Sequence, residues 1–322
     1  MTPATVTATI GRTDIEAAYE AIRAHVRRTP VISVDPTDLG IAGLNAPLVV
    51  KLEQLQRAGS FKVRGAFTNL LTRELPSAGV VAASGGNHGV AVAFAAHERG
   101  VPAAVFVPSI SNPAKIERIR SLGANLVVVD GEYADALVAA DAWQAGSGAL
   151  SVHAYDQRET VLGQGTVGLE LINQATVDTI LVPVGGGGLI GGVAAYVAGS
   201  VRVIGVEPTG APTLATALAH GAPVDAPTGS IAADALGAKR VGELMFPIAR
   251  QHVSAVVLVE DDDIRAAQHA LWRAVRVIVE PAAAVGVAAL VSGAYRPEAG
   301  ERVAVILTGA NTTPGSLDQP LP

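Results

Sequence analysis

The chain has 322 residues, of which 49% are hydrophobic, 16% charged and 4% aromatic, so it can build a large core and carries too little charge for intrinsic disorder. Its 29 acidic and 23 basic residues give a net charge of −6 and are spread along the sequence, which argues against a nucleic acid partner. The absence of cysteine excludes disulfides, thiolate nucleophiles and cysteine metal sites.

The N-terminal sequence MTPATVTATIGRTDIE has neither the basic nor the apolar region of a signal peptide, and we therefore expect a cytoplasmic protein. Residues 179–201 carry no charge over a length that could span a membrane. Pro183 and the glycines after it would leave backbone groups unsatisfied in lipid, whereas a buried strand, a turn and a helix satisfy them. We therefore expect no membrane association.

Runs rich in Val, Leu and Ile alternate with glycine turns and Ala-rich segments, which is the pattern of a parallel sheet covered by helices. In chain order, strands are expected at 80–84, 103–108, 125–130, 179–184, 201–207 and 302–308. Helices are expected at about 89–99, from Pro113 with Asn112 as cap to Gly123, before Gly146, at 189–199, at 262–277 and after Pro281. Asp261, Asp262 and Asp263 suit the positive end of a helix better than a metal, and the tail after Pro314 is expected to be disordered.

The sequence GGGGL at residues 185–189 follows an expected strand and opens an expected helix. Glycine amides at a helix N-terminus form an anion site, because no Cβ atom keeps a phosphate away. Gly186, Gly188 and Gly191 also satisfy the dinucleotide fingerprint, and Glu207 stands where an acid would bind the ribose. By itself this pattern favours an NAD-dependent oxidoreductase.

Lys62 lies in the sequence GSFKVRGA, at the expected start of a helix. Both the helix N-terminus and the neighbouring Arg64 disfavour an ammonium ion at this position. We therefore expect the pKa of Lys62 to be lowered, so that its free amine can act as a nucleophile or a base.

Two further segments place polar groups at the carboxyl ends of strands, which face the ligand crevice in sheets of this kind. The loop SGGNHG, from Ser84 to Gly89, combines helix N–H groups with a hydroxyl and an amide and suits a carboxylate. The sequence TGAN at 308–311 ends the last strand, and Glu280 precedes a helix. For His88 alone, a structural and a catalytic role are equally compatible with the sequence. The chain has no G-x-S-x-G motif, which removes the serine hydrolase nucleophile elbow.

Taken in chain order, the four segments GSFKVRGA, SGGNHG, PVGGGGL and LTGAN resemble the fold type II pyridoxal-phosphate enzymes, which have a tryptophan synthase β-like fold. The resemblance is specifically to the serine/threonine dehydratase and serine racemase branch. VHAYDQRETVLGQGTVGLEL, GAKRVGEL and EPAAAVGVAAL are similar to further stretches of the family, so the resemblance covers nearly the whole chain. It implies two three-layer α/β/α lobes with the cofactor in the cleft. The large domain would comprise residues 1–73 and 153–322, and the small one residues 74–152.

The resemblance also implies a role for individual residues. Lys62 would form the Schiff base with pyridoxal 5′-phosphate and act as the base at the substrate α-carbon. The other predicted cofactor-binding residues are Phe61 against the ring, Asn87 at the ring hydroxyl, the amides of Gly185, Gly186, Gly187, Gly188 and Leu189 at the phosphate, Glu280 beside the cofactor, and Thr308 at the pyridine nitrogen. The predicted substrate-binding residues are Ser84, Gly86, Asn87 and His88. No metal ligand is assigned, because Thr213 stands where metal-binding relatives have an acid.

The function implied is β-elimination of water from a 3-hydroxy amino acid, such as L-threonine or L-serine, to a 2-oxo acid and ammonia. A neutral Thr308 disfavours transamination, since a hydroxyl does not stabilise a protonated pyridine nitrogen. Gly85 stands where the racemases have a serine, so little racemase activity is expected.

Several alternatives remain open. Within the family they are a 3-hydroxyaspartate dehydratase, a serine racemase and a β-replacement enzyme of the cysteine-synthase kind. Outside it they are the NAD-dependent oxidoreductase and a binding protein without activity, against which Lys62 argues. We also expect a homodimer and, since the chain ends soon after TGAN, a catabolic enzyme without isoleucine feedback.

Overall fold

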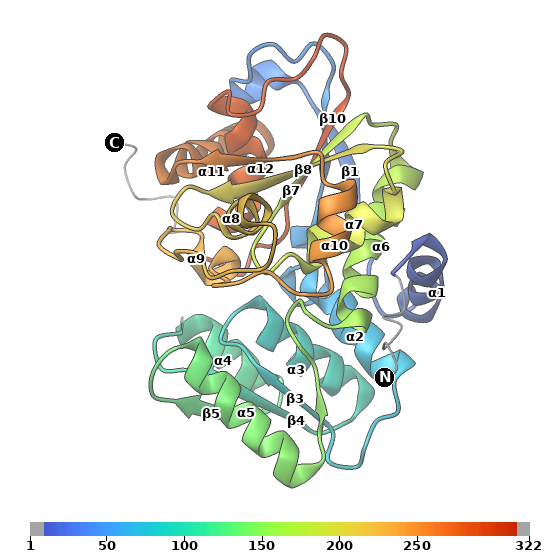
Figure 1. Cartoon of the computed structure of the whole chain (residues 1–322), viewed down its shortest axis with the longest axis vertical. Helices are drawn as coiled ribbons and strands as arrows, with labels where there is room; N and C mark the ends of the chain where they lie inside the picture. The colour runs from blue at the N-terminus through green and yellow to red at the C-terminus, as the bar shows by residue number, and fades with distance from the viewer. Residues whose placement is uncertain (1–9, 112, 314–322) are drawn as a thin grey trace.

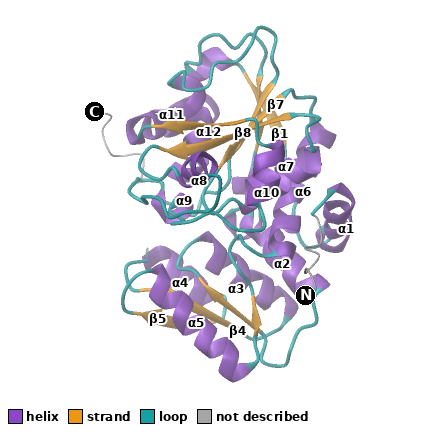
Figure 2. Ribbon diagram, in the orientation of Figure 1, coloured by secondary structure: helices purple, strands orange, loops and turns teal. Residues whose placement is uncertain are grey.

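The computed structural model describes residues 10–111 and 113–313. The predictions for the N-terminal nine residues, for Asn112 and for the tail after Pro314 lie outside these ranges. Two sheets, each covered by helices on both faces, form two lobes that lie one above the other in Figures 1 and 2.

The large lobe is built on a six-stranded sheet of order β1-β2-β10-β7-β8-β9, in which β1 and β2 are antiparallel and all other pairs are parallel. Its strands are β1 (Val31–Val34), β2 (Leu48–Lys51), β7 (Thr179–Pro183), β8 (Arg202–Pro208), β9 (Ala255–Val259) and β10 (Val303–Ile306). Its helices are α1 (Arg12–Ile22), η1 (Pro36–Leu39), η2 (Glu53–Leu55), η3 (Arg57–Gly59), α2 (Lys62–Thr72), α6 (Arg158–Gln174), α7 (Gly188–Val197), α8 (Thr213–His220), α9 (Ala233–Leu236), α10 (Phe246–His252), α11 (Asp261–Val275) and α12 (Pro281–Val291).

The small lobe is built on a four-stranded parallel sheet of order β5-β4-β3-β6. Its strands are β3 (Val80–Ala83), β4 (Ala103–Pro108), β5 (Asn125–Val129) and β6 (Leu150–Ser151). Its helices are α3 (Asn87–Arg99), α4 (Pro113–Ser121) and α5 (Tyr133–Ser147). α3 and α4 cover one face of the sheet, and α5 covers the other.

Side chains of the large sheet alternate between two separate hydrophobic clusters, as the period of two in a strand requires. Leu181 and Val305 belong to the cluster with α11 and α12, whereas Ile180 and Ile306 belong to the cluster with α6 and α7. Because both faces are buried, these strands read as continuous apolar runs in the sequence. Burial of both faces therefore explains why these strands could be predicted from the sequence.

The predicted elements are present, with shifts of a few residues at their ends. α3 begins at Asn87 and not at residue 89, and β10 ends at Ile306, so Thr308 lies just beyond its strand. The acids Asp261 to Asp263 form the first turn of α11, where the Asp263 carboxylate accepts the Glu260 N–H at 3.2 Å; the helix-end interpretation is confirmed. The domain boundaries after residues 73 and 152 stay a prediction.

Residues 179–201, which suggested a membrane span by length, form β7, the glycine loop and α7. In the part of the chain that the structure describes, no helix is both long enough and apolar enough to cross a membrane.

Helices α2, α6 and α7 approach one another closely at glycines. A Cβ atom on Gly163 of α6 would lie 2.6 Å from the Gly65 Cα of α2, and one on Gly192 of α7 would lie 2.5 Å from the Gly165 N of α6. Real side chains essentially never come this close to backbone, so these contacts require glycine. The three helices therefore fix how far the start of α2 lies from the start of α7.

Replacing Gly192 with alanine should destabilise the protein by about 1–3 kcal/mol, because the added methyl group must push α6 and α7 apart. Gly146 of α5 is a matched control, since a Cβ there has no neighbour within 4 Å, and Gly146→Ala should stabilise by about 0.5–1 kcal/mol. Urea denaturation measures both. Equal stability of Gly192→Ala and the wild type would contradict the tight helix contact.

Candidate active site

The segments GSFK and TGAN, far apart in sequence, lie side by side in the structure. The Phe61 N–H donates to the Thr308 carbonyl at 3.1 Å, the Ala310 N–H donates to the Gly59 carbonyl at 3.0 Å, and residues 60 and 309 form an isolated antiparallel bridge. Thr308 is buried. This pairing places a neutral hydroxyl-bearing residue beside the segment that carries Lys62.

Lys62 is the first residue of α2, and its Nζ donates to the Ala154 carbonyl at 2.9 Å. The Phe61 ring lies 5.3 Å from the same nitrogen. Burial lowers the pKa of Lys62 from 10.5 to about 8. The direction agrees with the sequence prediction, but the expected contribution of Arg64 is wrong, because the charge of Arg64 is balanced elsewhere.

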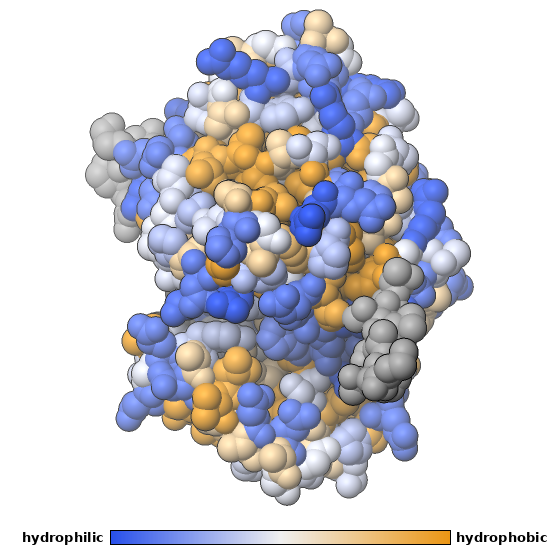
Figure 3. All heavy atoms as spheres, in the orientation of Figure 1, coloured by the Kyte–Doolittle hydropathy of each residue, from blue (hydrophilic) through white to orange (hydrophobic). Residues whose placement is uncertain are grey.

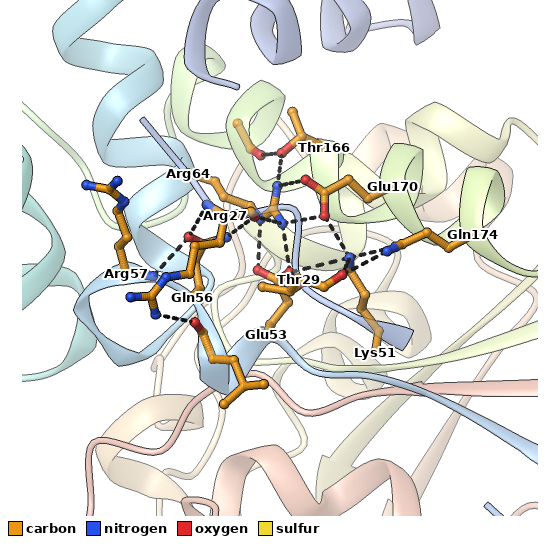
Figure 4. A network of polar contacts seen from close by, with 12 residues as sticks. Arg27, Thr29, Lys51, Glu53, Gln56, Arg57, Arg64, Thr166, Glu170 and Gln174 are labelled. Carbon is orange, nitrogen blue, oxygen red and sulfur yellow. Dashed lines mark hydrogen bonds and ion pairs between the residues drawn. The ribbon is translucent and has the colours of Figure 1, made fainter. Parts of the chain in front are cut away.

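Arg64 lies in a buried network of ionic contacts (Figure 4). Its guanidinium contacts both carboxylate oxygens of Glu53, at 2.8 and 2.7 Å, and both of Glu170, at 2.9 and 2.8 Å. The side chains of all three residues are at most 1% exposed. Two bidentate pairs hold the guanidinium, which suits its planar set of donors.

Lys51 completes this network and balances its charge. Its Nζ donates to Glu170 at 2.7 Å, to Gln174 at 2.8 Å and to the Thr29 carbonyl at 2.8 Å. The network thus holds two cations and two carboxylates, and it joins the end of β2 and the start of α2 to the middle of α6. Buried charges are tolerated only in such compensated arrangements.

The glycine loop between β7 and α7 packs so closely against neighbouring residues that its glycines could not be replaced by residues with side chains. Gly187 has φ +89°, and a Cβ atom there would lie 2.5 Å from the Met245 side chain. A Cβ on Gly188 would lie 3.0 Å from the Tyr155 Cα, and one on Gly186 would collide with the Tyr155 ring. The loop ends at the N-terminus of the ten-residue α7, so its amides and the helix dipole favour an anion.

Glu207, predicted from the dinucleotide pattern to bind a ribose, has another task. Its buried carboxylate accepts the Leu214 N–H at 2.7 Å and the Ala215 N–H at 2.9 Å, and so caps α8. Burial raises its pKa to about 7. Among residues 10–111 and 113–313 no group of three or more His, Asp or Glu side chains could hold a metal ion.

The loop that begins at Ser84 is joined to the large lobe through side chains. Asn87 Nδ2 donates to Glu280 at 2.6 Å, and Asn311 Nδ2 donates to the Asn87 Oδ1 at 2.7 Å. The Ser84 hydroxyl accepts the Gly86 N–H at 3.1 Å. The structure therefore brings the predicted residues Asn87 and Glu280 into direct contact at the base of the loop.

His88 is buried, with Nε2 2.8 Å from the Val152 carbonyl. Burial, together with the charge of Lys62, lowers its pKa to about 3. The ring is therefore neutral and serves to join α3 to the end of β6. This geometry favours the structural interpretation of the side chain and leaves only its backbone N–H for a substrate carboxylate.

The sequence prediction missed Lys115 and Asp234, which reach this site from α4 and α9. Lys115 Nζ lies 2.8 Å from the Glu280 Oε1 and also contacts Asp234. The one available signal is that Lys115 lies in the first turn of α4, where a cation opposes the helix dipole.

Comparison with known proteins agrees with this geometry. The family model "Pyridoxal-phosphate dependent enzyme" matches residues 22–309. This chain belongs to that family. It is 41% identical over 306 residues to an L-threonine ammonia-lyase of Geobacter sulfurreducens, covering 92% of this chain and 74% of the relative. It is 39% identical over 293 residues to a phenylserine dehydratase of Ralstonia pickettii, covering 89% of each. The structure of maize serine racemase matches with a TM-score of 0.89 and 34% identity, over 97% of this chain and 96% of the other.

The predicted α/β fold of the fold type II pyridoxal-phosphate enzymes and the predicted cofactor are thus confirmed. The residues present also fit that cofactor. The backbone amides of the glycine loop at the N-terminus of α7 suit a phosphate, and Lys62 supplies an amine of lowered pKa. The dinucleotide interpretation receives no support from Glu207, whose carboxylate is used within the protein.

Replacing Arg64 with alanine should destabilise the protein by about 3–5 kcal/mol, because Glu53 and Glu170 would stay buried with one cation instead of two. Arg120→Ala is the control, since Arg120 forms an exposed pair with Glu117 and should change stability by at most about 1 kcal/mol. Urea denaturation at pH 7 measures both. If both variants unfold at the urea concentration of the wild type, the network does not stabilise the fold.

Proposed function

We propose that this protein catalyses the elimination of water from a 3-hydroxy amino acid, yielding a 2-oxo acid and ammonia. The observation that carries the proposal is the pairing of GSFK with TGAN, which brings Thr308, a neutral residue and not a carboxylate, next to the segment that carries Lys62. Two relatives at 41% and 39% identity, a threonine ammonia-lyase and a phenylserine dehydratase, act on amino acids of this kind according to their names.

The bound cofactor supplies an electron sink for the α-carbon of the amino acid joined to it. The protein supplies the base: burial lowers the pKa of Lys62 to about 8, so its free-amine fraction near neutral pH exceeds that of an ordinary lysine, and this amine takes the proton from the α-carbon. The Ala154 carbonyl, 2.9 Å from Nζ, orients that amine. Loss of the α-proton and the β-hydroxyl removes one water, and one water is consumed when ammonia is released, so the net reaction is amino acid to 2-oxo acid and ammonia.

The N-terminus of α3 is the proposed receptor for the substrate carboxylate. Its first residues are Asn87 and His88, and the loop before it is held by the bond from Gly86 N–H to Ser84. Free N–H groups at a helix start, with the helix dipole behind them, favour an anion. The remaining predicted cofactor and substrate contacts, the domain boundaries, the homodimer and the cytoplasmic location are part of the same proposal.

The proposal is tested by spectrum and product assay. The protein with pyridoxal phosphate should be yellow, and borohydride should bleach it. L-Threonine, L-serine, 3-hydroxyaspartate and 3-phenylserine are then assayed separately for 2-oxo acid and ammonia. Lys62→Ala should lose the colour and at least about 10³-fold in turnover, whereas the exposed Lys239→Ala should keep both. A coloured wild-type protein that forms no 2-oxo acid from any of the four would disprove the proposal.

Racemisation is the second candidate, and one contact favours it. A Cβ atom on Gly85 would collide with the Ser111 Oγ, so a hydroxyl from the loop after β4 occupies the space of the missing side chain. Racemisation needs a second acid/base on the opposite face of the α-carbon, and Ser111 is the candidate for that group, because its hydroxyl fills the position that a side chain at residue 85 would take. Serine racemases are also among the relatives, at 34% identity in rice.

Elimination should still exceed racemisation, because residue 85, where the racemases have a serine, is a glycine, and the hydroxyl that fills its side-chain space comes from another loop. With L-serine as substrate, pyruvate and D-serine are measured together, and we expect pyruvate to form about tenfold faster or more. Ser111→Ala should leave pyruvate formation within about twofold and lower any D-serine formation. Equal rates of the two products in the wild type, with D-serine abolished by Ser111→Ala, would assign racemase activity instead.

A further inference from the structure

Lys115 is a buried lysine in a place where local structure disfavours a charge. It lies in the first turn of α4 and is 3% exposed. Both the helix dipole and the loss of water act against an ammonium there. Its charge must therefore be compensated by groups outside α4.

Both compensating carboxylates come from the other lobe. Glu280 Oε1 lies 2.8 Å from Lys115 Nζ, and Asp234 contacts the same nitrogen. Burial alone would lower the pKa of Lys115, but Glu280 and Asp234 raise it above its ordinary value. Lys115 is thus an ammonium ion held between α4 of the small lobe and the starts of α9 and α12 of the large lobe. Figure 3 shows hydrophilic side chains along the boundary between the two lobes.

The contact of Lys115 with Glu280 continues into the candidate site. The second oxygen of Glu280 accepts the Asn87 amide at 2.6 Å, and Asn311 donates to the Asn87 Oδ1 at 2.7 Å. The Glu280 N–H in turn donates to the Gly309 carbonyl at 3.1 Å. A continuous polar chain therefore runs from α4 through Glu280 and Asn87 to the TGAN segment.

The contact of Lys115 with Asp234 also bears on the Ser84 loop and the glycine loop. The helix α9, which carries Asp234, lies against both loops. A Cβ on Gly86 would lie 3.3 Å from the Asp234 carbonyl, and one on Gly185 would lie 3.0 Å from the Leu236 Cα. A shift of α4 relative to α9 would therefore displace the glycine loop or the Ser84 loop.

We propose that Lys115 is a positioning residue, whose ammonium group sets the small lobe against the large lobe and holds Asn87 in the orientation that completes the ligand site. Separating the lobes leaves one ammonium and two carboxylates without their partners, which opposes opening. The Lys115 ammonium thereby favours retention of a ligand between the lobes without contacting that ligand itself. As an effect on turnover this rests on the proposed function, whereas the effect on lobe contact does not.

Three variants separate this role from a general loss of stability. Lys115→Met removes the charge with little change in length, Lys115→Arg keeps the charge, and Asp234→Asn weakens the less buried of the two contacts. Lys239→Met is the matched control, because Lys239 is exposed and pairs with Asp225 at 3.3 Å. All are compared with the wild type after loading with pyridoxal phosphate and also free of cofactor.

For the amino acid substrate, Lys115→Met should raise KM about tenfold or more and lower kcat by less than about threefold, with Asp234→Asn intermediate and Lys115→Arg within about threefold of the wild type. In the cofactor-free protein, hydrogen exchange should become faster in α4 and at residues 84–89, but not in α6 or α7. Lys239→Met should change neither measurement.

Exchange in α4 and at residues 84–89 that is as slow in Lys115→Met as in Lys239→Met would overturn the proposal. So would a failure of Lys115→Arg to restore KM, or uniformly faster exchange in every helix of Asp234→Asn. If Lys115→Met fails to fold, Asp234→Asn and Lys115→Arg still decide the matter. A wild-type protein without elimination activity would refute the proposed function, while the exchange measurement would still test Lys115.

Discussion

The fixed spacing between the start of α2 and the start of α7 is the constraint on which the rest of the site depends. One end carries Lys62 and the other carries the glycine loop, so a cofactor of fixed length must fit between them. Gly163 and Gly192 allow α6 to touch both helices at backbone distance, and Arg64 clamps α2 to α6 through Glu170. Close packing and buried ion pairs thus act on the same helix. The distance between the starts of α2 and α7 is therefore fixed, because a closely packed interior is hardly compressible.

The same network also determines the charge that Lys62 experiences. An arginine two residues along the helix would disfavour an ammonium at Lys62 if its charge were free. Glu53 and Glu170, both paired with Arg64, balance that charge, so burial alone lowers the pKa of Lys62. The buried cluster around Arg64 therefore anchors α2, which carries Lys62. Because its charges balance one another, the cluster does not shift the pKa of Lys62. An amine whose pKa is lowered by burial alone can still regain a proton, as the proposed role of Lys62 as a base requires in every turnover.

How far the sequence was informative follows from the range of the interactions involved. The glycine loop before a helix, the lysine at a helix start and the loop between β3 and α3 were predictable as local structure, because each leaves a pattern within a few residues of sequence. The network was not predictable: Lys51 and Glu170 are 119 positions apart, and each looks like an ordinary surface charge in the sequence. The carbonyl of Ala154 carries no sequence signal, because every residue has one. The burial of Arg64 was likewise not predictable, because it depends on α6, which is distant in the sequence.

Charge placement differs between the two halves of the site, and this difference bears on how the site works. Around Arg64 the charges are fully buried within the large lobe and are separated only by unfolding. At Lys115 the ammonium belongs to one lobe and both carboxylates to the other, and Asp234 remains half exposed. Water can reach the second arrangement, so opening it costs less than breaking the first. The glycine loop that is proposed to bind the phosphate therefore lies on the more firmly held side, while the Ser84 loop that is proposed to receive the amino acid lies on the side that costs less to separate. A substrate must enter and leave in every turnover, whereas the cofactor stays, and the two kinds of ion pair are distributed accordingly.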